Sequence, residues 1–162
     1  MLLEMKVFGV TVDPFTNAPI VILKDFEEKN ALPVWIGVLE ASAIATELEN
    51  VRFSRPMTHD LLSSLLTETD TRVNKIEVND LKDNVYYATI HLDSLNGPLV
   101  LDARPSDAIA IALRMKSPIF VDSKVLDKSR SIELSQDKGA GSKDILEMLE
   151  ELSPEDFGKY KM

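Results

Sequence analysis

The chain has 162 residues, 44% of them hydrophobic, which is the size of a single domain with a substantial core. Its 27 acidic and 18 basic side chains give a net charge of −9, so no long-range attraction favours nucleic acid, which counts against a simple nucleic-acid-binding module. It has no cysteine and no apolar run near the roughly 18 residues of a membrane span, which excludes disulfides, thiolate catalysis, cysteine-ligated zinc and membrane insertion.

The first part of the chain predicts three strands and then two helices. The strands are rich in Val, Ile and Phe and are expected at residues 5–12, 19–24 and 32–36. After Gly37, apolar residues at helical spacing predict a helix: Ala41, Ile44, Ala45 and Leu48. A second helix is expected over residues 58–68, with Thr58 as its N-cap and with leucines along one side: Leu61, Leu62, Leu65 and Leu66.

The second part of the chain predicts the same order of elements. Strands are expected at residues 72–80, 84–93 and 98–102, and the middle one alternates apolar and polar residues, as in a sheet with one buried face. The helix that opens at Pro105 or Ser106 is apolar nearly all round. We therefore expect a second cover for it, from a subunit interface or from a central position in the domain. Residues 118–121 predict a last strand.

A shift of 65 residues aligns the two parts without a gap. Residues 33–48 then match residues 98–113 at five of sixteen positions. This internal repeat predicts an α+β fold with a mixed, largely antiparallel sheet. The sheet would come from a duplicated βββα unit with the helix of residues 58–68 inserted between the copies, and the helices would pack on one face.

The carboxy-terminal part differs in composition from the rest. We predict a domain over residues 1–126, then a polar linker and an acidic helical tail over residues 127–162. In the tail a narrow apolar stripe is formed by Ile145, Leu149 and Leu152. Such a helix can dock on a partner protein or on its own domain.

Two Arg-Pro motifs each precede a predicted helix. They are Arg55-Pro56-Met57-Thr58-His59-Asp60 and Asp102-Ala103-Arg104-Pro105-Ser106-Asp107. The first N–H groups of a helix lack internal partners and carry partial positive charge, so carboxylates are stabilised and phosphates bind there. If the two helix starts meet, acidic and basic side chains from both motifs share one site.

Such a site is suited to metal-dependent phosphodiester cleavage. Asp60, Asp102 and Asp107 would hold Mg²⁺ or Mn²⁺, because hard cations prefer carboxylate oxygens. Arg55 and Arg104 would bind the phosphate. Glu40 or His59 would transfer protons.

Each of these residues also has a structural explanation. Asp60 and Asp107 lie in first helical turns, where an acid contributes about 0.3–1 kcal/mol through the helix dipole. Arg104 can pair with Asp102, and His59 fits a partly buried, hydrogen-bonded imidazole. Two alternatives therefore stay open: motifs that only stabilise two helix starts, and a non-catalytic module that binds an anion or a protein partner there.

The motifs together resemble the bifunctional nuclease domain family. The resemblance rests on Leu32-Pro33-Val34-Trp35-Ile36-Gly37 with Glu40-Ala41-x-Ala43-Ile44-Ala45, on Arg55-Pro56-x-Thr58-His59-Asp60-Leu61, and on Asp102-Ala103-Arg104-Pro105-Ser106-Asp107-Ala108-Ile109-Ala110. It covers roughly residues 5–126 and implies a compact domain, found in bacteria and plants, with nuclease activity on DNA and RNA attributed to plant members. The chain is similar to bacterial members. Residues that match the family's pattern are Glu40, His59, Asp60, Asp102, Arg104 and Asp107.

The resemblance and the helix starts together predict a metal-dependent nuclease, a hydrolase that acts as DNase, RNase or both. We expect nucleic acid as its substrate and a cytoplasmic location. A homo-oligomer is also expected, with a dimer favoured, because a second subunit would cover apolar helix surface.

Overall fold

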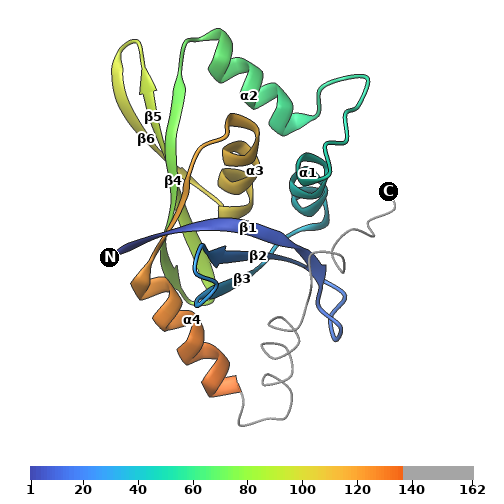
Figure 1. Ribbon diagram of the computed structural model, residues 1–162, viewed down its shortest axis with the longest axis vertical. Helices are drawn as coiled ribbons and strands as arrows, with labels where there is room; N and C mark the ends of the chain where they lie inside the picture. Colours follow the sequence, from blue (N-terminus) through green and yellow to red (C-terminus); the bar gives the residue numbers. More distant parts are fainter. Residues whose placement is uncertain (137–162) are drawn as a thin grey trace.

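The computed structural model describes residues 1–136 of the chain (Figure 1). In this part the elements follow one another as β1 (Leu2–Val12), β2 (Pro19–Asp25), β3 (Ala31–Trp35), α1 (Val38–Leu48), α2 (Thr58–Glu68), β4 (Arg72–Lys82), β5 (Val85–Ser94), β6 (Gly97–Ala103), α3 (Pro105–Met115), β7 (Ile119–Asp122) and α4 (Ser123–Gln136). This order confirms the predicted α+β fold, with two βββα units and a helix between them.

The strands of the described residues form one seven-stranded sheet in the order β3-β2-β1-β7-β4-β5-β6. Each βββ unit is an antiparallel meander, and no strand of one meander pairs with a strand of the other, because β7 lies between them. β7 is antiparallel to β1, with Leu2 opposite Asp122, and parallel to β4, with Ile76 opposite Ile119. The sheet is therefore mixed and largely antiparallel, as the sequence predicts.

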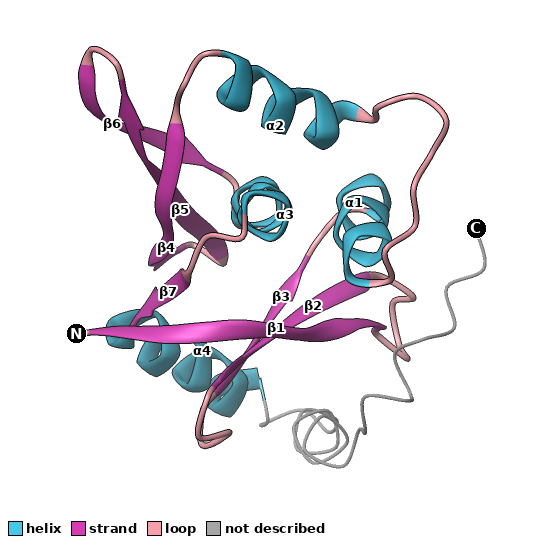
Figure 2. Cartoon of the chain, turned by 45° about the horizontal axis from the view of Figure 1, so that its top comes forward, coloured by secondary structure: helices cyan, strands magenta, loops and turns pink. Residues whose placement is uncertain are grey.

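Helices α1 and α3, the equivalent helices of the two units, lie side by side (Figure 2). α1 packs on β1 and β2, and α3 packs on β4 and β5. The run from Ala108 to Ala112 is fully or almost fully buried, because α3 is enclosed by the sheet, α1 and α2. A central position in the domain thus explains why α3 is apolar nearly all round.

Helix α2 differs from the other helices because it buries none of its residues. Of its four leucines, only Leu66 packs against the core, while Leu61, Leu62 and Leu65 are exposed. The N-cap is Met57 and not the predicted Thr58, because the helix is capped from within by Asp60, whose Oδ2 accepts the Met57 N–H at 2.9 Å. The leucines mark a helical face, but that face is turned away from the core.

Helix α4 crosses the domain boundary that the sequence predicts at residue 126. Residues 127–136 continue the helix and do not form a linker. The helix is held on the domain because Val125 and Leu126 are buried in the core and the Ser129 hydroxyl lies 3.2 Å from the Tyr86 hydroxyl. α4 lies on the other side of β1 from α1, α2 and α3 in both views (Figures 1 and 2). The prediction that the helices pack on one face of the sheet is therefore confirmed for α1, α2 and α3 and wrong for α4.

Two further predictions concern membranes and the tail. Among the described residues, no helix is long and apolar enough to cross a membrane. The predicted acidic helix with Ile145, Leu149 and Leu152 lies outside the described residues.

Candidate functional site

The N-termini of α2 and α3 meet, as the two Arg-Pro motifs suggest. His59, the second residue of α2, has its Nε2 atom 2.9 Å from Oδ1 of Asp107, the third residue of α3. Only 12% of the His59 side chain is exposed, and 30% of that of Asp107. The contact fixes the imidazole through one ring nitrogen, and the other ring nitrogen has no partner among the described residues.

Arg104 extends this contact to α1. Its Nε donates to Oδ2 of Asp107 at 2.9 Å, and its Nη1 lies 2.8 Å from Oε1 of Glu40. The side chain is 64% exposed, and its Nη2 has no partner among the described residues. We call Glu40, His59, Arg104 and Asp107 the His59 cluster.

Local backbone features position the members of the His59 cluster. Arg104 is the extended N-cap of α3, and Pro105 begins the helix, where its missing N–H costs nothing. Gly37 is the N-cap of α1, and a Cβ atom there would collide with the carboxylate of Glu40. A residue without a side chain at position 37 thus lets Glu40 fold back over the helix start, where it reaches Arg104.

The charges of the cluster stabilise one another. Burial alone would raise the pKa of Asp107, but hydrogen bonds from Arg104 and His59 outweigh it and hold that pKa below its usual value. The hydrogen bonds to Asp107 and then to Glu40 raise the pKa of Arg104. With a neutral imidazole the cluster carries a net charge of −1, from two carboxylates and one guanidinium.

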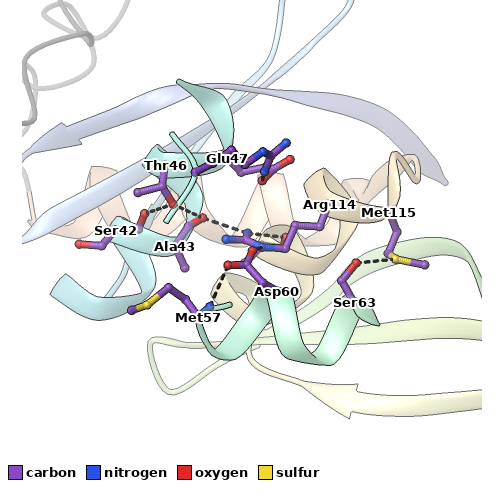
Figure 3. A network of polar contacts seen from close by, with 11 residues as sticks. Ser42, Ala43, Thr46, Glu47, Met57, Asp60, Ser63, Arg114 and Met115 are labelled. Carbon is purple, nitrogen blue, oxygen red and sulfur yellow. Dashed lines mark hydrogen bonds and ion pairs between the residues drawn. The ribbon is translucent and has the colours of Figure 1, made fainter. Parts of the chain in front are cut away.

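Asp60 belongs to a second network, which joins α2 to the far end of α3 (Figure 3). Its Oδ1 accepts from Nε of Arg114 at 2.8 Å, and its Oδ2 caps α2 through Met57. Arg114 also donates from Nη1 to the carbonyl oxygens of Ala43 and Ala110, at 3.0 Å each. Burial would raise the pKa of Asp60, but the hydrogen bonds from Arg114 and Met57 outweigh it and lower that pKa.

Asp102 and Arg55 do not join these networks. Asp102 pairs with Thr89 across the β5–β6 ladder, so its side chain lies on the exposed face of the sheet, opposite the face with Ala88 and Ile90 that α3 covers. Arg55 is exposed in the loop between α1 and α2, without an ion pair among the described residues. The structure therefore brings together Glu40, His59, Arg104 and Asp107, and places Asp60 beside them in a separate ion pair.

The predicted metal ligands do not fit a shared ion in this arrangement. Both oxygens of Asp60 and both oxygens of Asp107 already accept hydrogen bonds, and Asp102 lies on another face. In residues 1–136 no group of three or more histidine, aspartate or glutamate side chains is placed to hold a metal ion.

Arg114 is the residue of this region that the sequence reasoning missed. Its side chain is only 6% exposed and it anchors Asp60. The signal was an arginine in the last turn of a helix that is apolar nearly all round. A charge beside so much buried apolar surface needs a partner from a neighbouring element if it is buried as well.

Comparison with known proteins adds a family match and several relatives. The family model described as "Bifunctional nuclease domain" matches residues 21–133. An uncharacterized protein of Mycobacterium tuberculosis is 33% identical over 165 residues, which cover 95% of this chain and 97% of that protein. Bifunctional nuclease 1 of Arabidopsis thaliana is 29% identical over 119 residues, 70% of this chain and 36% of that protein. Bifunctional nuclease 2 of Oryza sativa subsp. japonica is 26% identical over 131 residues, 77% of this chain and 40% of that protein.

Proposed function

Because the chain belongs to the bifunctional nuclease domain family, we propose that it hydrolyses phosphodiester bonds of nucleic acid at the His59 cluster. The observation that carries this proposal is the 2.9 Å contact between His59 and Asp107 beside the exposed guanidinium of Arg104. An imidazole fixed by a carboxylate is a common proton-transfer group, and arginine is suited to bind a phosphate.

In the proposed reaction each member of the cluster has one role. Asp107 holds Nε2 of His59, which leaves the other ring nitrogen to take a proton from the attacking water. The water oxygen bonds to phosphorus, the bond from phosphorus to the leaving oxygen breaks, and His59 returns the proton to that oxygen. Nη2 of Arg104 stabilises the charge on the phosphate oxygens, while Glu40 and Asp107 hold the guanidinium in place.

Metal dependence stays a prediction, and no step above depends on it. Mg²⁺ or Mn²⁺ at Asp60 and Asp107 would compete with the arginine partners of these carboxylates, and Asp102 would have to reach the ion from the other face of the sheet. The assay below therefore contains each metal ion separately and a chelator.

The alternative is a non-catalytic module that binds an anion or a protein at the same helix starts. The net charge of −1 on the cluster with a neutral imidazole supports it, since negative charge opposes the approach of a phosphate. Binding of nucleic acid without cleavage would favour this alternative.

The experiment uses the two histidines of the chain as a matched pair. His59 contacts Asp107, and His91 contacts Glu77 at 3.4 Å on the exposed face of the sheet. Single-stranded DNA and RNA would be incubated with the wild type, His59→Gln and His91→Gln, in Mg²⁺, in Mn²⁺ and in chelator. We expect His59→Gln to lose about 100-fold or more of the cleavage rate and His91→Gln to keep it.

Intact folding of both variants would be checked by circular dichroism and thermal unfolding. Equal loss in the two variants, or cleavage that survives His59→Gln in a well-folded sample, would refute the proposed role of the cluster. Activity in chelator would separately refute the predicted metal dependence.

A homodimer and a cytoplasmic location remain predictions for this chain. The exposed leucines of α2 support the dimer, because grouped exposed apolar side chains often mark subunit contacts. We call Leu61, Leu62 and Leu65 the α2 leucine face. A protein partner at residues 127–162 likewise remains a prediction.

A further inference from the structure

A pocket of about 310 Å³ opens beside the Asp60–Arg114 pair, and no member of the His59 cluster lines it. Its walls come from α1, from the loop that follows it, and from the side chains of Asp60 and Arg114. The volume is at the lower end of the range for small-molecule sites. None of the proposed roles in hydrolysis uses this pocket.

Arg114 brings unused hydrogen-bond donors to the pocket. A guanidinium has five N–H donors, and here Nε bonds to Asp60 while Nη1 bonds to Ala43 and Ala110. Nη2 has no partner among the described residues, although the side chain is more than nine-tenths buried. No fully buried side-chain nitrogen or oxygen in the described part of the chain lacks a partner. Nη2 is therefore in contact with solvent. Because Arg114 lines the pocket, we take the pocket as the solvent-filled space that Nη2 reaches.

Two neighbouring side chains add charge and an apolar surface. Arg52 lines the same pocket, is 68% exposed and is oriented by Glu47, whose Oε2 lies 2.8 Å from its Nη1. Phe53, the next residue, also lines the pocket and is 45% exposed. A wall with two arginines, one aspartate and an exposed ring is suited to a ligand that combines an anion with a flat apolar part.

We propose that this pocket binds the phosphate of a nucleotide, with Nη2 of Arg114 and the guanidinium of Arg52 as donors and with the base against Phe53. The site does not depend on the proposed hydrolysis, since it uses none of the residues of the His59 cluster. Two sources share this chemistry: a free nucleotide, and one nucleotide of a strand that also reaches the cluster. His59 and Asp60 are adjacent in α2, so a strand would pass from one site to the other around the start of this helix.

The test measures binding to the full chain by isothermal titration calorimetry. The probes are inorganic phosphate, a nucleoside monophosphate and a short single-stranded oligonucleotide with a non-cleavable backbone. The variants are Arg52→Gln, Phe53→Ala and, as a matched control, Arg130→Gln. Arg130 is also an exposed arginine held by one side chain, Asn30 at 2.7 Å, and it lies on α4. Arg114→Lys tests the buried donors, because it keeps the charge but loses the two Nη2 donors.

We expect wild type and Arg130→Gln to bind alike, and Arg52→Gln and Arg114→Lys to bind about tenfold more weakly, since a hydrogen bond to a charged group contributes about that factor. Phe53→Ala should weaken the nucleotide and leave inorganic phosphate unchanged. A site for free nucleotides is indicated if the monophosphate binds as well as the oligonucleotide, and a strand site if the oligonucleotide binds more tightly. The proposal is overturned if no probe binds, or if Arg52→Gln and Arg114→Lys bind like the wild type.

These outcomes are independent of cleavage. A wild type that binds the monophosphate through Arg52 but cleaves nothing would refute the proposed hydrolysis and leave the pocket assignment intact. Cleavage that continues without binding in the pocket would refute the pocket assignment and leave the proposed hydrolysis intact.

Discussion

His59 and Asp107 are 48 residues apart in the chain, and their side chains join the starts of α2 and α3 at 2.9 Å. Two more polar side-chain contacts connect these helices among the described residues: Asp60 with Arg114, and Ser63 with Met115 at 3.0 Å. Because α2 buries no residue completely, these polar contacts carry much of its attachment to the domain. We therefore expect the position of α2 to depend on charge.

Loss of the Asp107 charge should loosen α2. Asp107→Asn keeps the size of the side chain but weakens its hydrogen bonds to His59 and Arg104. We expect the free energy of unfolding to fall by about 1–2 kcal/mol, as for other hydrogen bonds to charged groups. Urea unfolding measures this change, and amide hydrogen exchange should rise along residues 58–68. The control is Asp93→Asn, an exposed acid on β5, and an equal effect in the two variants would contradict the prediction.

Acid should weaken the Asp60–Arg114 contact in a defined direction. The pKa of Asp60 is lower in the folded chain, because the hydrogen bonds from Arg114 and Met57 outweigh burial. An unfolded aspartate has a pKa of about 3.9, so the contact stabilises the fold fully above that value and is lost as pH falls through the lower folded pKa. Asp60→Asn should therefore be less stable than the wild type at pH 7 and lose less stability below about pH 5.

The measurement is urea unfolding at a series of pH values. Parallel stability curves for wild type and Asp60→Asn would show that this carboxyl has the same pKa in the folded and unfolded chain, contrary to the prediction.

A methyl group at position 37 should act through Glu40. Gly37→Ala pushes the flexible end of Glu40 away from Gly37 and so from Arg104. Because only a side-chain end must move, we expect a stability loss below about 1 kcal/mol. Cleavage should fall by the same factor in Gly37→Ala, in Glu40→Gln and in the double variant, since all three disturb one contact. Additive losses in the double variant would mean that the two positions act separately.

Polar substitution of the α2 leucine face should alter assembly and leave the subunit stable. Leu65 is 57% exposed, so Leu65→Gln should change the free energy of unfolding by less than about 0.5 kcal/mol. If α2 forms the subunit contact, the variant should be monomeric by light scattering at concentrations where the wild type is dimeric. Val85→Gln is the control, because Val85 is 53% exposed and lies at the other end of β4 from α2. A monomeric wild type, or dissociation in both variants, would contradict the prediction.

The regular elements could be predicted because their local patterns agree with their tertiary surroundings. In β5, Ala88, Ile90 and Leu92 alternate with polar residues and are indeed the buried set. Helix α4 was missed because only Val125, Leu126 and Ser129 of its described side chains are buried, a set too small to stand out in a polar segment. In α2 the apolar stripe correctly predicted a helix, but such a stripe does not reveal which surface covers it, and most of these leucines are exposed.

The candidate site was predicted in part for a similar reason. Helix-start chemistry identified Arg104, Asp107 and His59 as candidates, because caps and first turns are local features, and the structure shows that the two helix starts meet. Asp102 was grouped with Asp107 by its nearness in sequence, yet it belongs to strand β6, where alternation assigns it to the exposed face with Thr89. The pairing of Asp60 with Arg114 depends on how α2 crosses α3, and that geometry is not encoded locally.

The place of β7 between the two meanders sets an order of events during synthesis. Residues 119–122 are made after both βββα units, yet β1 at the amino terminus and β4 in the middle both pair with them. On the ribosome, the first unit must therefore wait with one side of β1 unpaired until nearly all of the described chain has emerged. Such distant pairings slow folding and leave a strand edge open to other chains meanwhile, so the growing polypeptide is most prone to aggregation just before β7 appears.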